Sequence, residues 1–429
     1  MRFWILSAFA CAAVFAANTT TGVTFHKDVL PILQNKCQEC HRPGEAAPMS
    51  LLSYKEARPW AKAIKEAVLV KRMPPWFAEA GIGKFHNERR LSDAEVNTIA
   101  GWADSGAPEG SAKDAPRPRQ FVEGWNIGKP DLEFEIGMDF PVQASGTIEY
   151  TYFMVPSNFT EDRWVERVEV RPGNRAVVHH VIAFTRAPGA KWMQEIKPGV
   201  PYVPKRVRGG SEGDGGGGGG RELLVGYAPG LPPTILRPGQ AIKVAAGSDI
   251  IFQLHYTANG KEATDRSKIG LIFAKEPPKH RVLTMGATNA RFVIPANADH
   301  HQVDSTITLR EDTQLVSLMP HMHLRGKDFE YRATFPTGES KTLLRVPKYD
   351  FNWQLFYYLD EEMLLPKGTR IDCTAHFDNS ANNKANPDPS KEVRWGDQSW
   401  EEMMIGWFTV AFPANEDPMK IFRAPRAQR

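Results

Sequence analysis

A series of short, strand-like segments runs through the chain after about residue 130, and this pattern most constrains the fold. The segments are rich in β-branched and aromatic residues and are separated by turn residues, which is typical of antiparallel sheets. The 35 glycines and 33 prolines among 429 residues also disfavour an all-helical protein. Because about 300 residues exceed one small sandwich, we expect two all-β antiparallel sandwich (jelly-roll-like) domains, at 131–276 and 277–420, and a tail at 421–429. The segments are Thr147–Val155, Trp164–Val170, Val177–Thr185, Ile250–Thr257, Ile269–Phe273, Val282–Ile294 and Thr306–Leu309.

The region before these segments has helical patterns instead. Ser53 and Ser92 are each followed three residues later by a Glu and then by an apolar-periodic run, which predicts capped helices. We therefore expect a small all-α domain at residues 18–115. A Pro-, Gly- and charge-rich stretch then predicts a linker at 116–130.

The first 17 residues combine one Arg, an apolar run and a small-residue end, which is typical of a secretory signal. A retained N-terminal anchor remains the alternative. The signal predicts a periplasmic or secreted protein, and no later segment is apolar for the ~18 residues that a membrane span needs. The net charge of only +3 does not indicate a basic surface that would bind nucleic acid.

The pentamer Cys37-Gln38-Glu39-Cys40-His41 is the attachment motif for c-type haem. Two thiols bond to the haem and the adjacent imidazole reaches the iron. A zinc or redox C-x-x-C is the alternative, but no second C-x-x-C completes a zinc site. Four cysteines also exclude a disulfide scaffold, and Cys373 is expected to be a buried strand residue.

Met73, in the sequence Arg-Met-Pro-Pro-Trp, is the candidate for the sixth iron ligand, because a thioether raises the haem potential and suits electron transfer. Met49 is the weaker competitor, and a core role for Met73 remains open. Together these features predict a cytochrome c-like haem domain at residues 18–115.

Five of the twelve histidines form three groups in the strand-like region. A strand places His321 and His323 on one face, so both imidazoles can reach one metal ion. The adjacent His179 and His180 point to opposite faces of an ideal strand, so sharing an ion requires a bulge there. With His255, these groups predict metal binding, since imidazole suits copper and zinc.

At these residues the chain resembles the ascorbate-dependent type II copper monooxygenases, the family of peptidylglycine α-hydroxylating monooxygenase and dopamine β-monooxygenase. The resemblance spans residues from about 130 to 415 and rests on VVHHVIAF, QLHYT, PHMHLRGK and EEMMIG. It implies two copper ions, and Met404 is the alternative to Met403 as the sulfur ligand. The implied ligands are His179, His180 and His255 at the first site and His321, His323 and Met403 at the second.

The resemblance also implies a reaction: one atom of O₂ enters a substrate C–H bond and the other becomes water, at the cost of two external electrons. The all-histidine copper would relay an electron, and His321, His323 and Met403 would form the catalytic site that binds O₂. A small-molecule substrate and an external electron donor, either an ascorbate-like reductant or a periplasmic redox protein, would be the partners. The haem domain would supply the electrons.

Two positions depart from the peptide-hydroxylating members. The Arg that holds the substrate carboxylate is replaced by Met319, and a Tyr after the copper Met is replaced by Trp407. A peptidyl-glycine substrate is therefore disfavoured relative to a more apolar one. Two other function classes remain open: a non-enzymatic haem and copper electron-transfer or copper-binding protein, and a zinc hydrolase, to which the Met ligand is poorly suited.

Overall fold

The structure of the chain is a computed structural model that describes residues 22–45, 47–204, 206–207, 210–211 and 221–422. The expected signal segment at residues 1–17 lies outside the described residues. The described residues group into two compact units, a smaller helical unit and a larger β unit.

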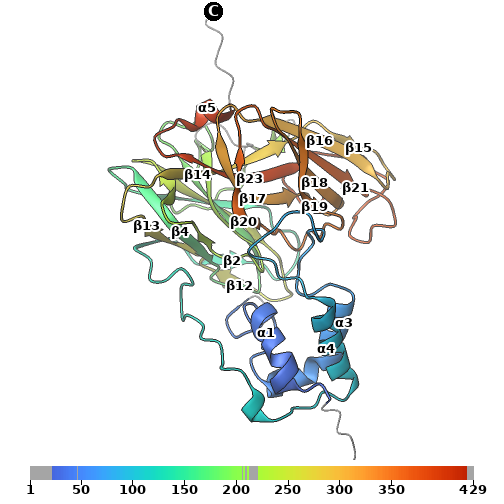
Figure 1. Cartoon of the computed structure of the whole chain (residues 1–429). Coiled ribbons are helices and arrows are strands. Elements are labelled where there is room, and N and C mark those ends of the chain that lie inside the picture. Colours follow the sequence, from blue (N-terminus) through green and yellow to red (C-terminus); the bar gives the residue numbers. More distant parts are fainter. Residues whose placement is uncertain (1–21, 46, 205, 208–209, 212–220, 423–429) are drawn as a thin grey trace, which may run out of the picture. The chain divides into compact units, whose positions relative to one another are not determined.

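The helical unit contains residues 22–43, 47–74 and 91–119. Its elements are η1 (Phe25–Val29), α1 (Leu30–Lys36), α2 (Tyr54–Ala57), η2 (Arg58–Trp60), α3 (Ala61–Leu69), α4 (Asp93–Asp104) and η3 (Ala112–Asp114). Figure 1 shows α1, α3 and α4 grouped together. Their apolar faces meet around Phe25 and Trp102, which are both fully buried with ring centroids 5.7 Å apart.

Both expected helix starts are observed. Ser92 accepts the backbone N–H of Glu95 at 3.3 Å, and the Glu95 carboxylate accepts the Ser92 backbone N–H at 2.7 Å, which completes a capping box at α4. Ser53 accepts the backbone N–H of Glu56 and so caps α2, a helix of only one turn. These caps satisfy backbone donors that have no partner inside the helix.

The β unit contains residues 44–45, 75–90 and 120–422. Its main sheet has nine strands among the described residues, in the order β1-β13-β4-β10-β14-β23-β17-β20, with β9 beside β4. These strands are β1 (Leu132–Glu135), β4 (Arg163–Arg171), β9 (Thr234–Ile235), β10 (Gln240–Val244), β13 (Lys268–Phe273), β14 (His280–Thr288), β17 (Thr313–His321), β20 (Tyr357–Leu365) and β23 (Ile405–Pro413).

Two four-stranded sheets pack against the two halves of the main sheet. The first, in the order β3-β11-β5-β8, shares a core with β4 and β13, in which Phe252 meets Val168 and Leu271. The second, in the order β16-β21-β18-β19, shares a core with β17 and β23, in which Tyr331 meets Phe408. The strands are β3 (Thr151–Pro156), β5 (Val178–Arg186), β8 (Arg221–Tyr227), β11 (Asp249–Tyr256), β16 (His301–Thr308), β18 (Gly326–Thr334), β19 (Ser340–Val346) and β21 (Arg370–Phe377).

Short elements complete the β unit. Three further pairs of strands form two-stranded sheets in the described part of the chain. The remaining elements are β2 (Phe140–Val142), β6 (Arg206–Val207), β7 (Gly210–Ser211), β12 (Ala263–Asp265), β15 (Val293–Ile294), β22 (Val393–Arg394) and α5 (Pro418–Phe422).

The expected fold class, a small all-α cytochrome c domain followed by two all-β antiparallel sandwich domains, is wrong. The structure is mostly β, with 36% strand and 12% helix, and no small all-α cytochrome domain is evident among its described residues. Within the expected 18–115 region, residues 75–90 belong to the β unit, where the Glu79 N–H donates to the Arg345 carbonyl oxygen at 2.8 Å. The two expected sandwiches share one main sheet, because β10 pairs with β14 in parallel across the 276/277 position.

The expected strand segments mostly coincide with observed strands. The segment Val282–Ile294 is the exception, since β14 ends at Thr288 and β15 begins at Val293. Between them the Asn289 backbone N–H donates to the Met404 carbonyl oxygen, and its side chain donates to that of Asp304 at 2.8 Å. These bonds satisfy the polar groups of Asn289 where the chain leaves the sheet. Because they join residues far apart in the sequence, a local sequence pattern could not predict where the strand ends.

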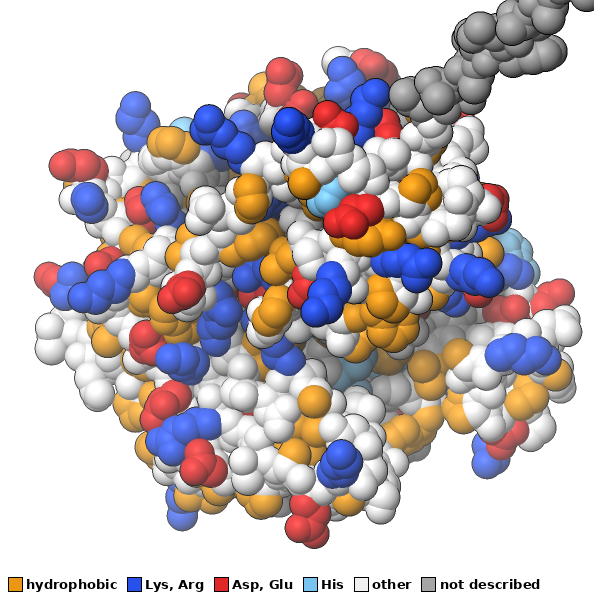
Figure 2. Space-filling model, turned by 90° about the horizontal axis from the view of Figure 1, so that it is seen from below, with side chains coloured by type: hydrophobic (Ala, Val, Ile, Leu, Met, Phe, Trp, Pro, Cys, Tyr) orange, Lys and Arg blue, Asp and Glu red, His pale blue; other side chains and the backbone are white. Residues whose placement is uncertain are grey.

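Acidic and basic side chains are interspersed on the face of the molecule drawn in Figure 2, in keeping with the small net charge. None of the helices in the described ranges combines the length and the apolar character that crossing a lipid bilayer requires.

Candidate functional site

Three histidines meet at one end of the first four-stranded sheet. His179 and His180 lie on β5 and His255 lies on the neighbouring strand β11, directly opposite His180. The next pair in the register is Tyr256 with Val178, so His179 is the extra residue of a β-bulge. The bulge that sharing one ion requires is therefore present, and one ring nitrogen from each histidine lies within 4.8 Å of the others.

Burial keeps these three imidazoles neutral. It lowers the pKa of His255 to about 3 and lowers the pKa values of His179 and His180 as well. His179 Nδ1, His180 Nε2 and His255 Nδ1 are buried without a hydrogen-bond partner in the described structure. Because a buried polar atom without a partner is costly, a partnerless nitrogen on each of three clustered histidines fits a bound transition metal ion.

The second histidine group lies at the end of β17. The His321 and His323 rings have centroids 5.3 Å apart and stand almost perpendicular, at 87°. Gln354 Oε1 lies 2.9 Å from His321 Nδ1, and the Glu401 carbonyl oxygen lies 3.3 Å from His323 Nδ1. Acceptors at both Nδ1 atoms leave both Nε2 atoms as the available ligand atoms.

β17 ends at His321, so strand alternation alone does not position His323. The buried Glu402 carboxylate does, because it accepts the backbone N–H of His323 at 2.8 Å and that of Arg325 at 2.7 Å. Burial raises the pKa of Glu402 to about 8, and these two backbone hydrogen bonds oppose the rise. The carboxylate thus fixes the turn that presents the second imidazole.

The two methionines just before β23 have different surroundings. Met403 lines the same cavity as His321 and His323. Met404 is fully buried in the core shared by the main sheet and the second four-stranded sheet. Of the two alternatives, Met403 lines the cavity and Met404 does not.

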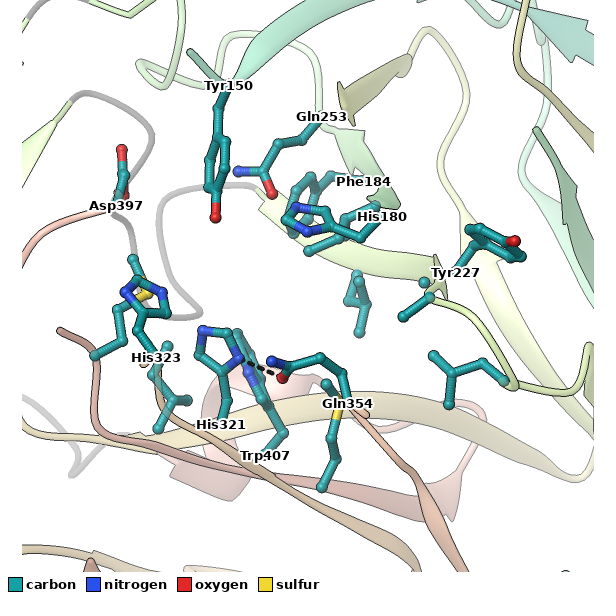
Figure 3. A pocket seen from close by; sticks show the side chains of 18 of the residues that line it. Tyr150, His180, Phe184, Tyr227, Gln253, His321, His323, Gln354, Asp397 and Trp407 are labelled. Carbon is teal, nitrogen blue, oxygen red and sulfur yellow. Dashed lines mark hydrogen bonds between the residues drawn. The ribbon is translucent and has the colours of Figure 1, made fainter. Parts of the chain in front are cut away.

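One cavity joins the two histidine groups, with a volume of about 130 Å³. Figure 3 shows His180 on one side of it and His321, His323 and Gln354 on the other. Its walls are mainly apolar and aromatic, and both positions that depart from the peptide-hydroxylating pattern, Met319 and Trp407, line it. Further aromatic residues of the wall are Tyr150, Phe184, Tyr227, Phe351, Phe356 and Trp395.

A single aromatic ring touches both histidine groups. Phe351 stacks on His179 with centroids 5.6 Å apart and an interplanar angle of 18°, and its ring meets that of His323 at 5.8 Å and 76°. The same loop carries Gln354, whose Nε2 donates to the Phe351 carbonyl oxygen at 3.0 Å. The loop at residues 349–354 therefore contacts the first site and orients the second.

Sequence reasoning missed Phe351 and Gln354 and placed Glu402 only as a neighbour of Met403. The loop sequence YDFNWQ has no ligand spacing and no periodicity that marks it. Its role follows from the fold, which brings residue 351 against residue 179.

The C-x-x-C-H residues lie just after α1 in the helical unit. The backbone N–H groups of Cys40 and His41 donate to the Cys37 carbonyl oxygen at 3.1 and 2.9 Å, so one turn brings the motif together. Burial, with a smaller contribution from Cys40, raises the pKa of Cys37 to about 12. His41 Nδ1 lies 3.3 Å from the Met49 carbonyl oxygen, which leaves Nε2 for a metal, and the thiols are free of disulfides. This set fits a c-type haem.

The structure places Met73 after α3 in the same unit, where its backbone N–H donates to the Ala67 carbonyl oxygen at 3.2 Å. Met49 packs against the core of the helical unit. The choice of Met73 as sixth ligand stays a prediction.

Comparison with known proteins identifies no family. No family model matches the chain, and no curated protein matches it. Among solved structures, PNGF-II is similar over 68% of this chain and 66% of its own, just under two thirds, at 9% identity and a TM-score of 0.26. The major capsid protein P2 of bacteriophage PM2 is similar over 66% of this chain and 99% of its own, at 8% identity and a TM-score of 0.28. Similarities this weak support no inference about function.

Proposed function

We propose that the chain is an exported copper-dependent monooxygenase that hydroxylates a C–H bond with O₂ and receives its electrons through a c-type haem. The observation that carries the proposal is the single cavity lined by His180 of the first histidine group and by His321, His323 and Met403. Two sites with different ligands, one of them with a thioether, suit a reaction in which two electrons arrive singly.

Copper bound at the two sites would supply the one-electron transfers and the O₂ activation that the reaction needs. In the overall balance, the substrate C–H bond, O₂, two electrons and two protons give an alcohol and water. The chain supplies the ligands: three neutral imidazoles at the first site, and two imidazoles with the Met403 thioether, a ligand that favours Cu(I), at the second. The aromatic walls exclude water from the reacting carbon, and Met319 and Trp407 favour an apolar substrate.

Metal content and metal ligation test the proposal together. We expect two coppers and one covalent haem per purified chain. X-ray absorption of the reduced copper protein is expected to show a copper–sulfur contribution that Met403→Leu removes and Met404→Leu retains. Zinc in place of copper at the two cavity sites, no metal at those sites, or a sulfur contribution that survives Met403→Leu would contradict the proposal.

Product formation separates the enzyme from the non-enzymatic alternative. With ascorbate as reductant and a panel of small apolar C–H compounds as probes, a monooxygenase consumes O₂ in step with an oxygenated product. Oxygen uptake with no oxygenated product from any probe would favour an electron-transfer or copper-binding protein.

A further inference from the structure

A second histidine and carboxylate cluster lies on the second four-stranded sheet, apart from the residues of the candidate site. Asp328 of β18 and His376 of β21 are directly paired across the two strands, and His376 Nδ1 lies 2.7 Å from Asp328 Oδ1. His300, just before β16, stacks on His376 with ring centroids 4.1 Å apart and an interplanar angle of 7°. One donor atom from each of the three lies within 4.8 Å of the others.

We propose that His300, Asp328 and His376 form a third metal site, which takes a divalent first-row transition ion such as Zn²⁺ or Cu²⁺. Two imidazoles and one carboxylate are a ligand set that these ions accept, with bonds of about 2.0–2.2 Å. Asp328 and His376 are half-buried and His300 is exposed, so solvent supplies the remaining ligands and the ion has a direct path to the site.

The backbone around the cluster is already fixed. The two strands that carry Asp328 and His376 are paired along their length, so their separation is set by the sheet. The chain before His300 is held by two hydrogen bonds, from the Asn379 backbone N–H to the Ala298 carbonyl oxygen at 2.7 Å and from Lys327 Nζ to that of Asp299 at 2.8 Å.

Binding requires one local movement. The two imidazole rings are stacked in parallel, so their nitrogen lone pairs do not converge on one point. The exposed His300 ring is the one that can turn about its Cβ–Cγ bond, and the ion would replace the proton that His376 Nδ1 shares with Asp328 Oδ1. The ion would thus close a site of which two ligands are preformed and the third is adjustable.

The test uses Zn²⁺ and the full-length protein. Carbethoxylation with diethyl pyrocarbonate, mapped by peptide mass spectrometry, is expected to modify His300 at least fivefold more slowly when Zn²⁺ is present. Asp328→Asn and His376→Gln are expected to abolish this protection, and His301→Gln is expected to retain it. Equilibrium dialysis is expected to show one equivalent of Zn²⁺ fewer for His300→Gln than for the wild type, and no loss for His301→Gln.

Thermal unfolding of each variant, compared with the wild type, shows that the fold survives the substitution. Equal modification of His300 with and without Zn²⁺ in the wild type would overturn the proposal, as would unchanged zinc stoichiometry in His300→Gln. Because none of the three residues belongs to the two cavity sites, either outcome leaves the proposed monooxygenase function unaffected.

Discussion

Gln354 decides which nitrogen of His321 is free. Its Oε1 accepts a hydrogen bond from His321 Nδ1 at 2.9 Å and one from the Tyr349 hydroxyl at 3.2 Å. Its Nε2 donates a hydrogen bond to the Phe351 carbonyl oxygen. The neutral imidazole then carries its proton on Nδ1 and offers Nε2 to a metal. The side-chain amide of Gln354 thus controls the orientation of the His321 ring.

Replacing Gln354 with Leu is expected to weaken copper binding at the second site by about 10- to 100-fold, the usual effect of losing such an outer partner. The three-histidine site should keep its affinity, because its nitrogens make no contact with Gln354. Competition with a Cu(I) chelator measures both affinities. Asn352→Ala is the control, since the Asn352 side chain donates to that of Asp350 and makes no hydrogen bond to either histidine group among the described residues. Equal losses in the two variants would argue against the orienting role.

Among the structural elements, the loop at residues 349–354 contacts both histidine groups through one ring, and we expect this ring to set their spacing. Phe351→Ala removes that ring and is expected to cost about 2 kcal/mol of stability, since the side chain is half-buried. In protein loaded with copper at both proposed sites, it should also change the magnetic interaction between the two Cu(II) ions, as seen by electron paramagnetic resonance. Phe356→Ala is the matched control, because that ring lines the cavity but stacks on Tyr358. An unchanged spectrum in Phe351→Ala would show that the ring does not set the spacing.

Strand β23 is packed too tightly for a side chain at Gly406. A Cβ atom there would collide with the sulfur of the fully buried Cys373 and lie 3.0 Å from the Tyr331 ring. Gly406→Ala is therefore expected to destabilise the protein by about 2 kcal/mol in urea unfolding. Cys373→Ala removes the sulfur, so the double variant should recover part of the loss, and strictly additive effects would rule out the contact.

Helix α4 depends on its capping box. Ser92→Ala removes the side-chain acceptor for the Glu95 N–H and is expected to cost about 1 kcal/mol in the unfolding of the helical unit, followed by circular dichroism. Thr98→Ala, in the same helix, should cost little, because its hydroxyl only bonds back to the Ala94 carbonyl oxygen. A larger loss for Thr98→Ala would contradict this account.

At the scale of the whole molecule, the sequence predicted local groupings of residues better than architecture. His179, His180 and His255 were predicted to share a site, and the bulge that their adjacency demands is present. Cys373 was correctly predicted to be buried. The spacing of histidines and the strand period are local properties, so one sequence is enough to read them. The parallel pairing of β10 with β14 is not local, so two sandwiches that share a sheet were predicted as two domains.

The shared sheet predicts that the β unit unfolds as one cooperative structure. Val282, on β14 of the second half, is buried in the core of the first half together with Val316 and Ala411. Val282→Ala leaves a cavity there and is expected to cost about 2 kcal/mol. Because the two halves of the β unit share a sheet and a core, we expect the free energy of unfolding to fall by the same amount in both halves.

Amide hydrogen exchange of β11 and β21 measures this directly, since one strand lies in each four-stranded sheet. If the β unit opens as a whole, the slowest amides of both strands lose protection by the same free energy in Val282→Ala. A loss confined to β11 would mean that the halves unfold independently despite their common sheet. Because the candidate site takes ligands from both halves, joint opening would also mean that metal bound at either site stabilises the entire β unit.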